Sequence, residues 1–241
     1  MYTDLQPSPR YQQLLGYYRL MHKNGFSRRQ GERVVHVPPE EAFAGRAMTS
    51  FIYSIRGVIR ATGSETILDY GSGKGLQYSE ELVRKRKVIA SSIHDFWKVR
   101  EITCYDPAIN NSFLSDRIKF DGVVSTNVID HIPEEDLEWV LKRLFSKSRK
   151  FVFLNVANFN SPFWLPNGEN ARIIRKPRTW WTAKLEKINQ HFPDVAHCLA
   201  YAETKKTEEG IRRQFTSYLH NCPGLILPGP KVKVKGSLKA S

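Results

Sequence analysis

The sequence predicts an α/β protein with a mainly parallel, doubly wound sheet, helices on both faces and a helical cap at the N-terminus. Segments of strand character, at residues 100–105, 120–126 and 150–156, alternate with segments of helical character. This alternation is the pattern of parallel α/β sheets. An earlier apolar run at residues 66–68 leads directly into a glycine-rich turn, the connection at which doubly wound sheets bind ligands.

The predicted cap comprises residues 1–62. We expect a helix over residues 9–24, where apolar side chains recur every three or four positions and Gly25 follows. Residues 26–38 are basic and polar, which indicates a loop, and a second helix is expected from Pro38 to about residue 61. The first helix suits either packing on the domain or covering a ligand.

The main domain is predicted over residues 63–222, followed by a basic C-terminal tail at residues 223–241. Further helices and one strand are expected within the main domain: helices at residues 76–86, 134–146, 179–191 and 207–220, and a strand near 195–202. In the tail, residues 231–235 alternate Lys and Val, a pattern that suits a strand or a frayed end.

The composition favours an anionic partner. The 241-residue chain has 37 Lys and Arg against 24 Asp and Glu, a net charge of +13, and such an excess attracts nucleic acid or other polyanions. A solvated basic face is the alternative. There is no apolar run of about 18 residues and no secretory signal, so neither a membrane span nor secretion is expected.

The cysteines do not indicate a metal site. Cys104, Cys198 and Cys222 are scattered, without a Cys-x-x-Cys pair, so neither a zinc site nor a disulfide framework is expected. Reduced thiols fit a cytoplasmic protein best.

The glycine-rich turn has the sequence Asp-Tyr-Gly-Ser-Gly-Lys-Gly at residues 69–75. Its third glycine comes one residue too early for the dinucleotide fingerprint G-x-G-x-x-G. A P-loop is excluded too, because Leu68 stands where its first glycine belongs and Gly75 where Ser or Thr belongs. An ordinary glycine-rich turn stays open as the alternative.

Asp-x-Gly-x-Gly-x-Gly after a strand resembles motif I of the class I S-adenosylmethionine-dependent methyltransferases, which have a Rossmann-like fold. The resemblance implies that the glycines bend around the methionine and ribose of the cofactor and that Asp69 holds the ammonium group. Other segments extend it over about residues 10–200, including Tyr105-Asp106-Pro107-Ala108 and the stretch Leu-Pro-Asn-Gly-Glu-Asn-Ala from residue 165. The chain looks like small methyltransferase-domain proteins of bacteria and phages whose substrates are mostly unassigned.

The implied cofactor contacts lie after successive strands. They are Asp69, Tyr70, Gly71, Ser72, Gly73 and Gly75 after the first strand, Asp106 and Pro107 after the second, and Asn127 and Val128 after the third. An acid at the end of the second strand accepts hydrogen bonds from ribose hydroxyls in doubly wound folds. Asp106 can instead be a turn former, because it precedes a proline.

Three residues are candidates for a general base: His131, Asp130 and Glu169. The segment Ile-Asp-His-Ile at residues 129–132 resembles the region after the fourth strand of these methyltransferases, and histidine can act as a base near neutral pH. A structural histidine is the alternative. Residues 125–128 lack the Pro-Pro-Tyr/Phe element of adenine-amino methylation, and Cys104 and Cys198 do not follow a proline as the nucleophile of cytosine-C5 methylation would.

Residues 158–178 are predicted to form a long polar loop, and long loops in compact domains are usually functional or disordered. The stretch 165–181 is the predicted substrate-facing segment. Its candidate substrate contacts are Asn167, Asn170, Arg172, Trp180 and Trp181. Arginines there can receive phosphate or carboxylate, and the tryptophans can form a flat wall or pack on the sheet. Related sequences usually carry a histidine in place of Arg172, so no base is expected there.

Taken together, the sequence predicts methyl transfer from S-adenosylmethionine to an oxygen or nitrogen of an unknown, anionic acceptor. The alternative is a catalytically silent protein of the same fold that binds nucleic acid or an assembly through its basic surface. A different reaction that consumes S-adenosylmethionine is a third interpretation.

Overall fold

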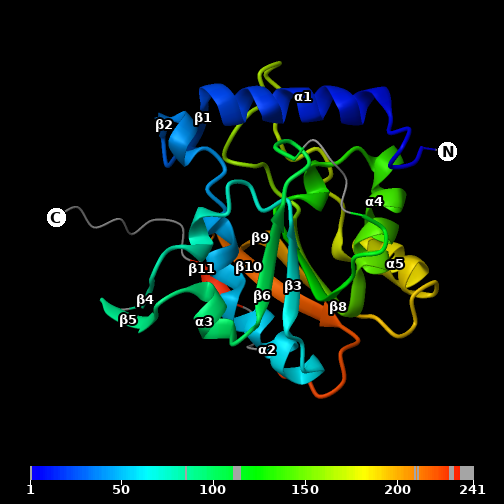
Figure 1. The fold of residues 1–241 in the computed structure, drawn as a ribbon. Helices are drawn as coiled ribbons and strands as arrows, with labels where there is room; N and C mark the ends of the chain where they lie inside the picture. The colour runs from blue at the N-terminus through cyan, green and yellow to red at the C-terminus, as the bar shows by residue number, and fades with distance from the viewer. Residues whose placement is uncertain are drawn as a thin grey trace.

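The computed structural model is a mixed α/β fold around one twisted sheet (Figure 1). It describes residues 2–84, 86–110, 115–208, 210, 212–227 and, for the backbone, 231–233. Within these residues the sheet has seven strands. In spatial order they are β11 (Lys231–Lys233), β10 (Arg212–His220), β9 (Ala196–Lys206), β8 (Ser148–Ala157), β7 (Phe120–Thr126), β3 (Thr66–Tyr70) and β6 (Glu101–Tyr105).

The sheet is mainly parallel. Five neighbouring strands pair in parallel, in the spatial order β6, β3, β7, β8 and β9. At one edge, β10 and β11 are added antiparallel. Counted along the chain, the parallel part has the order 2-1-3-4-5, a doubly wound order compatible with a Rossmann-like fold. Its crossovers change direction between β3 and β7, and ligands of such sheets bind beyond the carboxyl ends of the strands at that point.

Helices cover both faces of the sheet, as the sequence predicts (Figure 1). The α-helices are α1 (Pro9–Asn24), α2 (Ile52–Thr62), α3 (Ile93–Trp97), α4 (Glu134–Lys147) and α5 (Arg178–Asn189). One apolar core joins α2 and α3 to the sheet, and a second core joins α4 and α5 to its opposite face. Both faces of β3 are therefore covered, and all five of its residues, Thr-Ile-Leu-Asp-Tyr, are buried.

The first helix of the cap, α1, crosses the end of the sheet (Figure 1). Ser8 caps it, since its Oγ accepts from the Tyr11 N–H at 3.0 Å. Ser8 is itself held by Asp136 at the start of α4, whose Oδ1 accepts the Ser8 N–H at 2.9 Å. Because Ser8 and Asp136 are both fully buried, this contact fixes the helix to the domain.

The rest of the cap differs from the expectation. Residues 26–38 form a hairpin of β1 (Phe26–Gln30) and β2 (Arg33–Val37) in place of the expected loop. The second expected helix is broken into the 3₁₀ helices η1 (Pro39–Glu41) and η2 (Arg46–Phe51) before α2 begins. Gly45 breaks it at φ 84°, because a left-handed residue cannot continue a helix.

Two helices expected in the main domain are strands. After the glycine loop, only the 3₁₀ helix η3 (Leu76–Tyr78) forms, followed by a hairpin of β4 (Leu82–Arg84) and β5 (Lys87–Ala90). The expected helix at 207–220 is instead β10, which continues from β9 as an antiparallel partner. β-branched and aromatic residues in both segments favour strands over helices. In the second segment, pairing with β9 also stabilises the strand β10.

The C-terminal tail is described in part. Lys231–Lys233 pairs with β10 as β11, which matches the strand interpretation of the alternating segment. Residues 228–230 and 234–241 lie outside the described residues.

Gly122 in β7 tests how tightly the sheet packs. A Cβ at this position would lie 2.1 Å from Phe151 Cε1, so Gly122→Ala should lower the free energy of unfolding by about 1–3 kcal/mol through overpacking. A Cβ on Gly16, inside α1, would have no heavy atom within 4 Å, so Gly16→Ala should raise it by about 0.5–1 kcal/mol. Urea unfolding of both variants measures the two signs, and equal effects would contradict this packing.

Candidate functional site

The glycine motif turns sharply at the carboxyl end of β3. Gly71, Gly73 and Gly75 have φ angles of 78°, 59° and 67°, which glycine adopts far more readily than other residues. A Cβ at Gly71 would lie 2.3 Å from Val128 Cγ2, and one at Gly73 would lie 2.0 Å from the Phe43 carbonyl oxygen. The close approach of the protein's own loops therefore requires glycine at both positions.

The backbone N–H groups of residues 71–75 all have acceptors within the protein. Those of Gly71 and Ser72 donate to the Tyr105 carbonyl at 2.7 and 3.3 Å. The other three bond separately: Gly73 to Asp106 Oδ2 at 2.9 Å, Lys74 to the Phe43 carbonyl at 2.8 Å, and Gly75 to the Ser72 carbonyl at 3.2 Å. A phosphate-binding loop needs converging free N–H groups, so this loop does not have the donors for a phosphate.

Asp106 joins the loops after β3 and β6. Besides the Gly73 N–H, its carboxylate accepts the Ala108 N–H through Oδ1 at 2.8 Å. The side chain is half-buried, and each carboxylate oxygen has a further lone pair. Asp106 is therefore both the turn former that the sequence allows and an acceptor with capacity left for a ligand hydroxyl.

Asp69 is the buried acid of the site, with 2% of its surface exposed. Its Oδ2 accepts from the Tyr78 hydroxyl at 2.9 Å and from Gln77 Nε2 at 3.3 Å. Burial raises the pKa of Asp69 to about 7, the Tyr78 hydrogen bond lowers it, and the charge of Asp106 raises it again. The carboxyl therefore changes charge near neutral pH, and a nearby cation would favour its ionised form.

The remaining implied cofactor residues surround this turn. Ser72 is buried beside the hollow described below, while the Tyr70 side chain turns away and lies 5.5 Å, centroid to centroid, from Tyr105. Pro107 is half-buried in the turn after β6. Asn127 has a φ of 57°, a conformation that asparagine tolerates, and it brings Val128 against the glycine loop.

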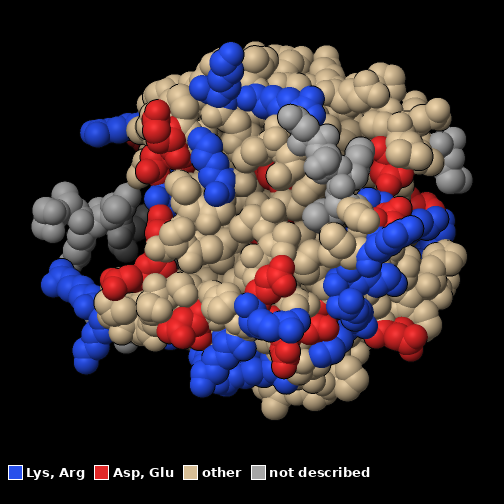
Figure 2. Space-filling model, in the orientation of Figure 1, with Lys and Arg blue, Asp and Glu red and all other residues tan. Residues whose placement is uncertain are grey.

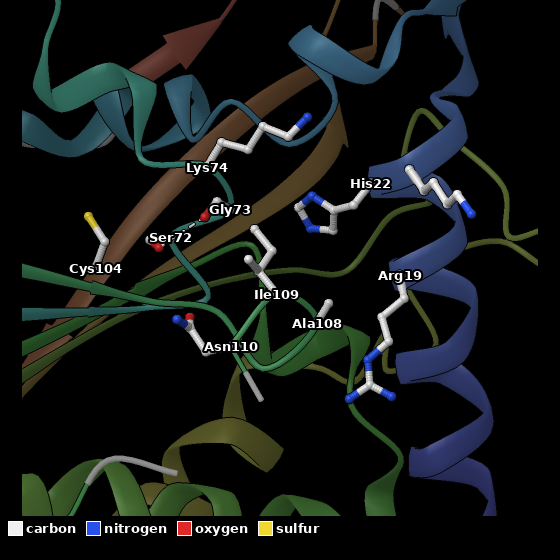
Figure 3. Close-up of a pocket in the computed structure, with 10 residues that line it drawn as sticks. Arg19, His22, Ser72, Gly73, Lys74, Cys104, Ala108, Ile109 and Asn110 are labelled. Carbon is white, nitrogen blue, oxygen red and sulfur yellow. Dashed lines mark hydrogen bonds between the residues drawn. The ribbon is translucent and has the colours of Figure 1, made fainter. Parts of the chain in front are cut away.

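An open hollow of about 510 Å³ lies between α1 and the loops after β3 and β6 (Figure 3). Its lining comprises Arg19, His22, Lys23, Ser72, Gly73, Lys74, Cys104, Ala108, Ile109 and Asn110. Four of these ten carry basic side chains, and none of the described lining residues is acidic. The hollow therefore attracts anionic groups. Asp106 accepts the N–H of Gly73 in its lining, whereas the buried Asp69 does not line it.

His22 is a functional candidate that sequence reasoning missed. Its ring projects from α1 into the hollow toward Gly73 (Figure 3). Within the described residues its buried Nδ1 has no hydrogen-bond partner. Burial lowers the pKa of His22, the charge of Asp106 opposes this, and Lys74 lowers it further. The ring is thus held neutral and can accept a proton. Its spacing of four from Tyr18 was the available signal, since it puts both side chains on one face.

Two candidate bases, His131 and Asp130, lie instead in a buried network beneath α1. The 3₁₀ helix η4 (Ile129–His131) carries both. The Tyr18 hydroxyl lies 2.8 Å from His131 Nδ1, and His131 Nε2 lies 3.6 Å from Asp130 Oδ1. Arg172 Nε donates to Asp130 Oδ2 at 2.6 Å. None of these four residues lines the hollow, so the network's evident role is to hold the loops together.

The long loop after β8, from which the predicted substrate-facing segment begins, folds back on itself. Asn170 Oδ1 accepts the Ser161 and Arg172 N–H groups at 2.9 and 3.1 Å, and Arg172 Nη1 donates to the Phe159 carbonyl at 2.7 Å. Asn167 is exposed. The buried Arg172 therefore holds parts of the protein together and is not the exposed receptor for an anion that the sequence suggests.

Glu169, Trp181 and Trp180 lie in three different environments. Glu169 is exposed and paired with Arg10 of α1. Trp181 is fully buried in the core that α5 forms with the sheet, so it takes the packing role. Trp180 is half-buried, with the ammonium groups of Lys176 and Lys184 5.5 and 5.2 Å from its ring centroid. Only Trp180 can offer a surface to a ligand.

The buried histidine of the network predicts acid sensitivity. Burial lowers the pKa of His131 from 6.5 to about 4, although Asp130 opposes the shift. Because the folded pKa lies below the unfolded one, the stability that neutral His131 contributes is complete above pH 6.5 and is lost as pH falls toward 4. Denaturant unfolding at several pH values should show this loss in wild type and a smaller loss in His131→Gln. His191→Gln, at an exposed site, is the matched control, and equal pH dependence in all three would contradict the prediction.

Comparison with known proteins does not identify a family: no protein-family model matches the chain, and no curated protein matches it. Within the described residues, no helix is both long and apolar enough to cross a membrane. In the same part of the chain, no group of three or more His, Cys, Asp and Glu side chains could hold a metal ion. A function has to be inferred from the fold and the site residues.

Proposed function

We propose that this protein is an S-adenosylmethionine-dependent methyltransferase that acts on an oxygen or nitrogen acceptor. The observation that carries the proposal is the combination of two acids with a glycine loop whose N–H groups are all occupied. Such a site suits a nucleoside ligand that presents an ammonium group and ribose hydroxyls but no phosphate. A dinucleotide or nucleoside triphosphate would need the free donors that this loop lacks.

The residues fit this ligand at the switch point of the sheet. Asp69, ionised by a neighbouring cation, would hold the ammonium group, directly or through water. Asp106 has lone pairs left for the ribose hydroxyls, and Lys74 and Arg19 line the hollow where a carboxylate could be neutralised. Val128, which follows Asn127, lies against Gly71 of the loop.

The bound cofactor would supply a methyl group already activated by its positive sulfur. The chain's own contribution is then mainly alignment of the acceptor with that methyl group, which accounts for a large part of such rate enhancements. Where the acceptor must lose a proton, His22 is better situated than His131, Asp130 or Glu169. Its ring faces the hollow (Figure 3) and its Nδ1 has no protein partner among the described residues.

The alternative is a catalytically silent protein of this fold that binds a polyanion. The basic lining of the hollow and the net charge of +13 favour it. It predicts nucleic-acid binding without methyl transfer.

Ligand binding should depend on pH through Asp69. Because the ionised carboxylate is the form that pairs with an ammonium group, and its pKa is about 7, affinity for S-adenosylhomocysteine should rise about 25-fold from pH 5.5 to 7.5. Calorimetry measures this. 5′-Methylthioadenosine, which lacks the amino-acid end, should bind with little pH dependence.

Two variants separate the contributions to this binding. Asp69→Asn should remove the pH dependence of S-adenosylhomocysteine binding. Asp106→Asn should weaken the binding of both S-adenosylhomocysteine and 5′-methylthioadenosine, because both carry the ribose. An absence of heat and of thermal shift with either ligand would refute the cofactor proposal.

His22 should matter for turnover rather than for cofactor binding. Loss of a general base typically lowers the rate about 10²- to 10⁴-fold, so His22→Gln should reduce tritium transfer from labelled S-adenosylmethionine to total bacterial RNA or protein by that order. Its affinity for S-adenosylhomocysteine should stay within about threefold of wild type. His220→Gln, at an exposed site on β10, is the control, and equal transfer by both variants would exclude the base role.

A further inference from the structure

The hairpin of β1 and β2 is a basic projection beside the hollow. Arg28, Arg29 and Arg33 are all exposed on it, and none of the three forms an ion pair with a carboxylate of the described residues. Gly25 connects the hairpin directly to α1, whose exposed Arg19 and Lys23 line the hollow. In Figure 2, basic side chains lie over α1 at the top of the view.

The charge of this segment is strongly one-sided. Between residues 19 and 36 there are five Lys and Arg and one acid, Glu32. Of the two acids that follow the hairpin, Glu41 is engaged by Arg46, while Glu40 is exposed. Residues 19–36 themselves carry a net charge of +4.

The backbone of the hairpin is hydrogen-bonded to the loop after β8. The Arg29 N–H donates to the Pro162 carbonyl at 2.6 Å, and Arg28 forms a β-bridge with Phe163. At its base, the ring of Phe26 lies 5.0 Å, centroid to centroid, from Phe163 and 4.7 Å from Phe43. The base of the hairpin is therefore linked to the glycine loop, since the Phe43 carbonyl also accepts the Lys74 N–H.

An aromatic ring accompanies the cations. The guanidinium of Arg29 lies 5.4 Å from the ring centroid of Trp164, which is half-buried. Cations that track a phosphate backbone, with an aromatic ring on which a base can stack, are the elements of single-strand nucleic-acid binding. A single small anion would instead be held by converging donors, whereas these side chains are spread along a ribbon and a helix.

We propose that the β1–β2 hairpin and Trp164, together with Arg19 and Lys23, bind single-stranded nucleic acid. The strand would run along the hairpin toward the hollow. Binding requires no methyl transfer, so the proposal stands independently of the proposed function. If both hold, the methyl acceptor is a nucleotide of the bound strand.

Fluorescence anisotropy with a labelled 20-nucleotide RNA or DNA single strand, without cofactor, tests the surface. The triple variant R28A/R29A/R33A should bind at least about tenfold more weakly than wild type. Because each lost phosphate contact removes about 0.7 from the salt slope of a single strand, the slope should fall by about 2. The matched control is R60A/R100A/R149A. It removes the same charge from exposed arginines beside the amino ends of the strands, and it should keep the wild-type slope and most of the affinity.

Trp164 distinguishes stacking from charge alone. Trp164→Ala should weaken single-strand binding about tenfold without changing the salt slope, and Trp164→Phe should restore most of it. Unchanged circular dichroism and unfolding midpoints confirm that the variants fold. Calorimetry with S-adenosylhomocysteine should be unaffected by the hairpin variant, which separates this surface from the cofactor site.

Three results would overturn the proposal. One is equal loss of binding in the two triple variants, which would mean that only net charge matters. Another is the absence of single-strand binding at 50 mM salt. The third is hairpin-dependent binding to vesicles of anionic phospholipid with no binding of the single strand, which would make the surface a membrane contact.

Discussion

The buried ion pair between Asp130 and Arg172 is the interaction on which the carboxyl edge of the sheet depends. Arg172 belongs to the loop after β8 and Asp130 to the turn after β7, and Asp130 Oδ2 also accepts the Ala157 N–H at 3.0 Å. Next to it, His131 contacts the Tyr18 hydroxyl of α1. Removing one partner of a buried pair typically costs about 3–5 kcal/mol, because the other charge stays buried. The same pair therefore holds both loops and the covering helix in place.

The main architecture could be predicted from the sequence because its signals are local. β3, β7 and β8 contain short apolar runs, and α4 follows Pro133 and begins with a cluster of acids that suit its positive end. The hairpins of β1 with β2 and β4 with β5 could not, since basic and polar residues hide their alternation. Their strands form because they pair with each other, a non-local contact that periodicity does not report.

For the candidate site, the sequence could place the two acids but could not rank the candidate bases. Asp69 lies near the carboxyl end of β3 and Asp106 follows β6. Because the carboxyl ends of parallel strands meet at one edge, a sequence pattern sufficed to bring them together. The bases could not be ranked in this way. His131 is a candidate because it follows a strand, yet it is buried and contacts Tyr18, whereas His22 lies on another element, the helix α1. Only the crossing of α1 over the hollow decides between them.

One helix accounts for both the proposed base and the basic rim. On α1, Tyr18 and His22 are four residues apart and turn inward, whereas Arg19 and Lys23, one residue further on, are exposed. A rotation of the helix would exchange these roles, and the buried Ser8–Asp136 contact at its start opposes such a rotation. A neutral proton acceptor and exposed cations are thus fixed side by side. An anionic acceptor strand could therefore be attracted by the rim while the group to be methylated meets an uncharged ring.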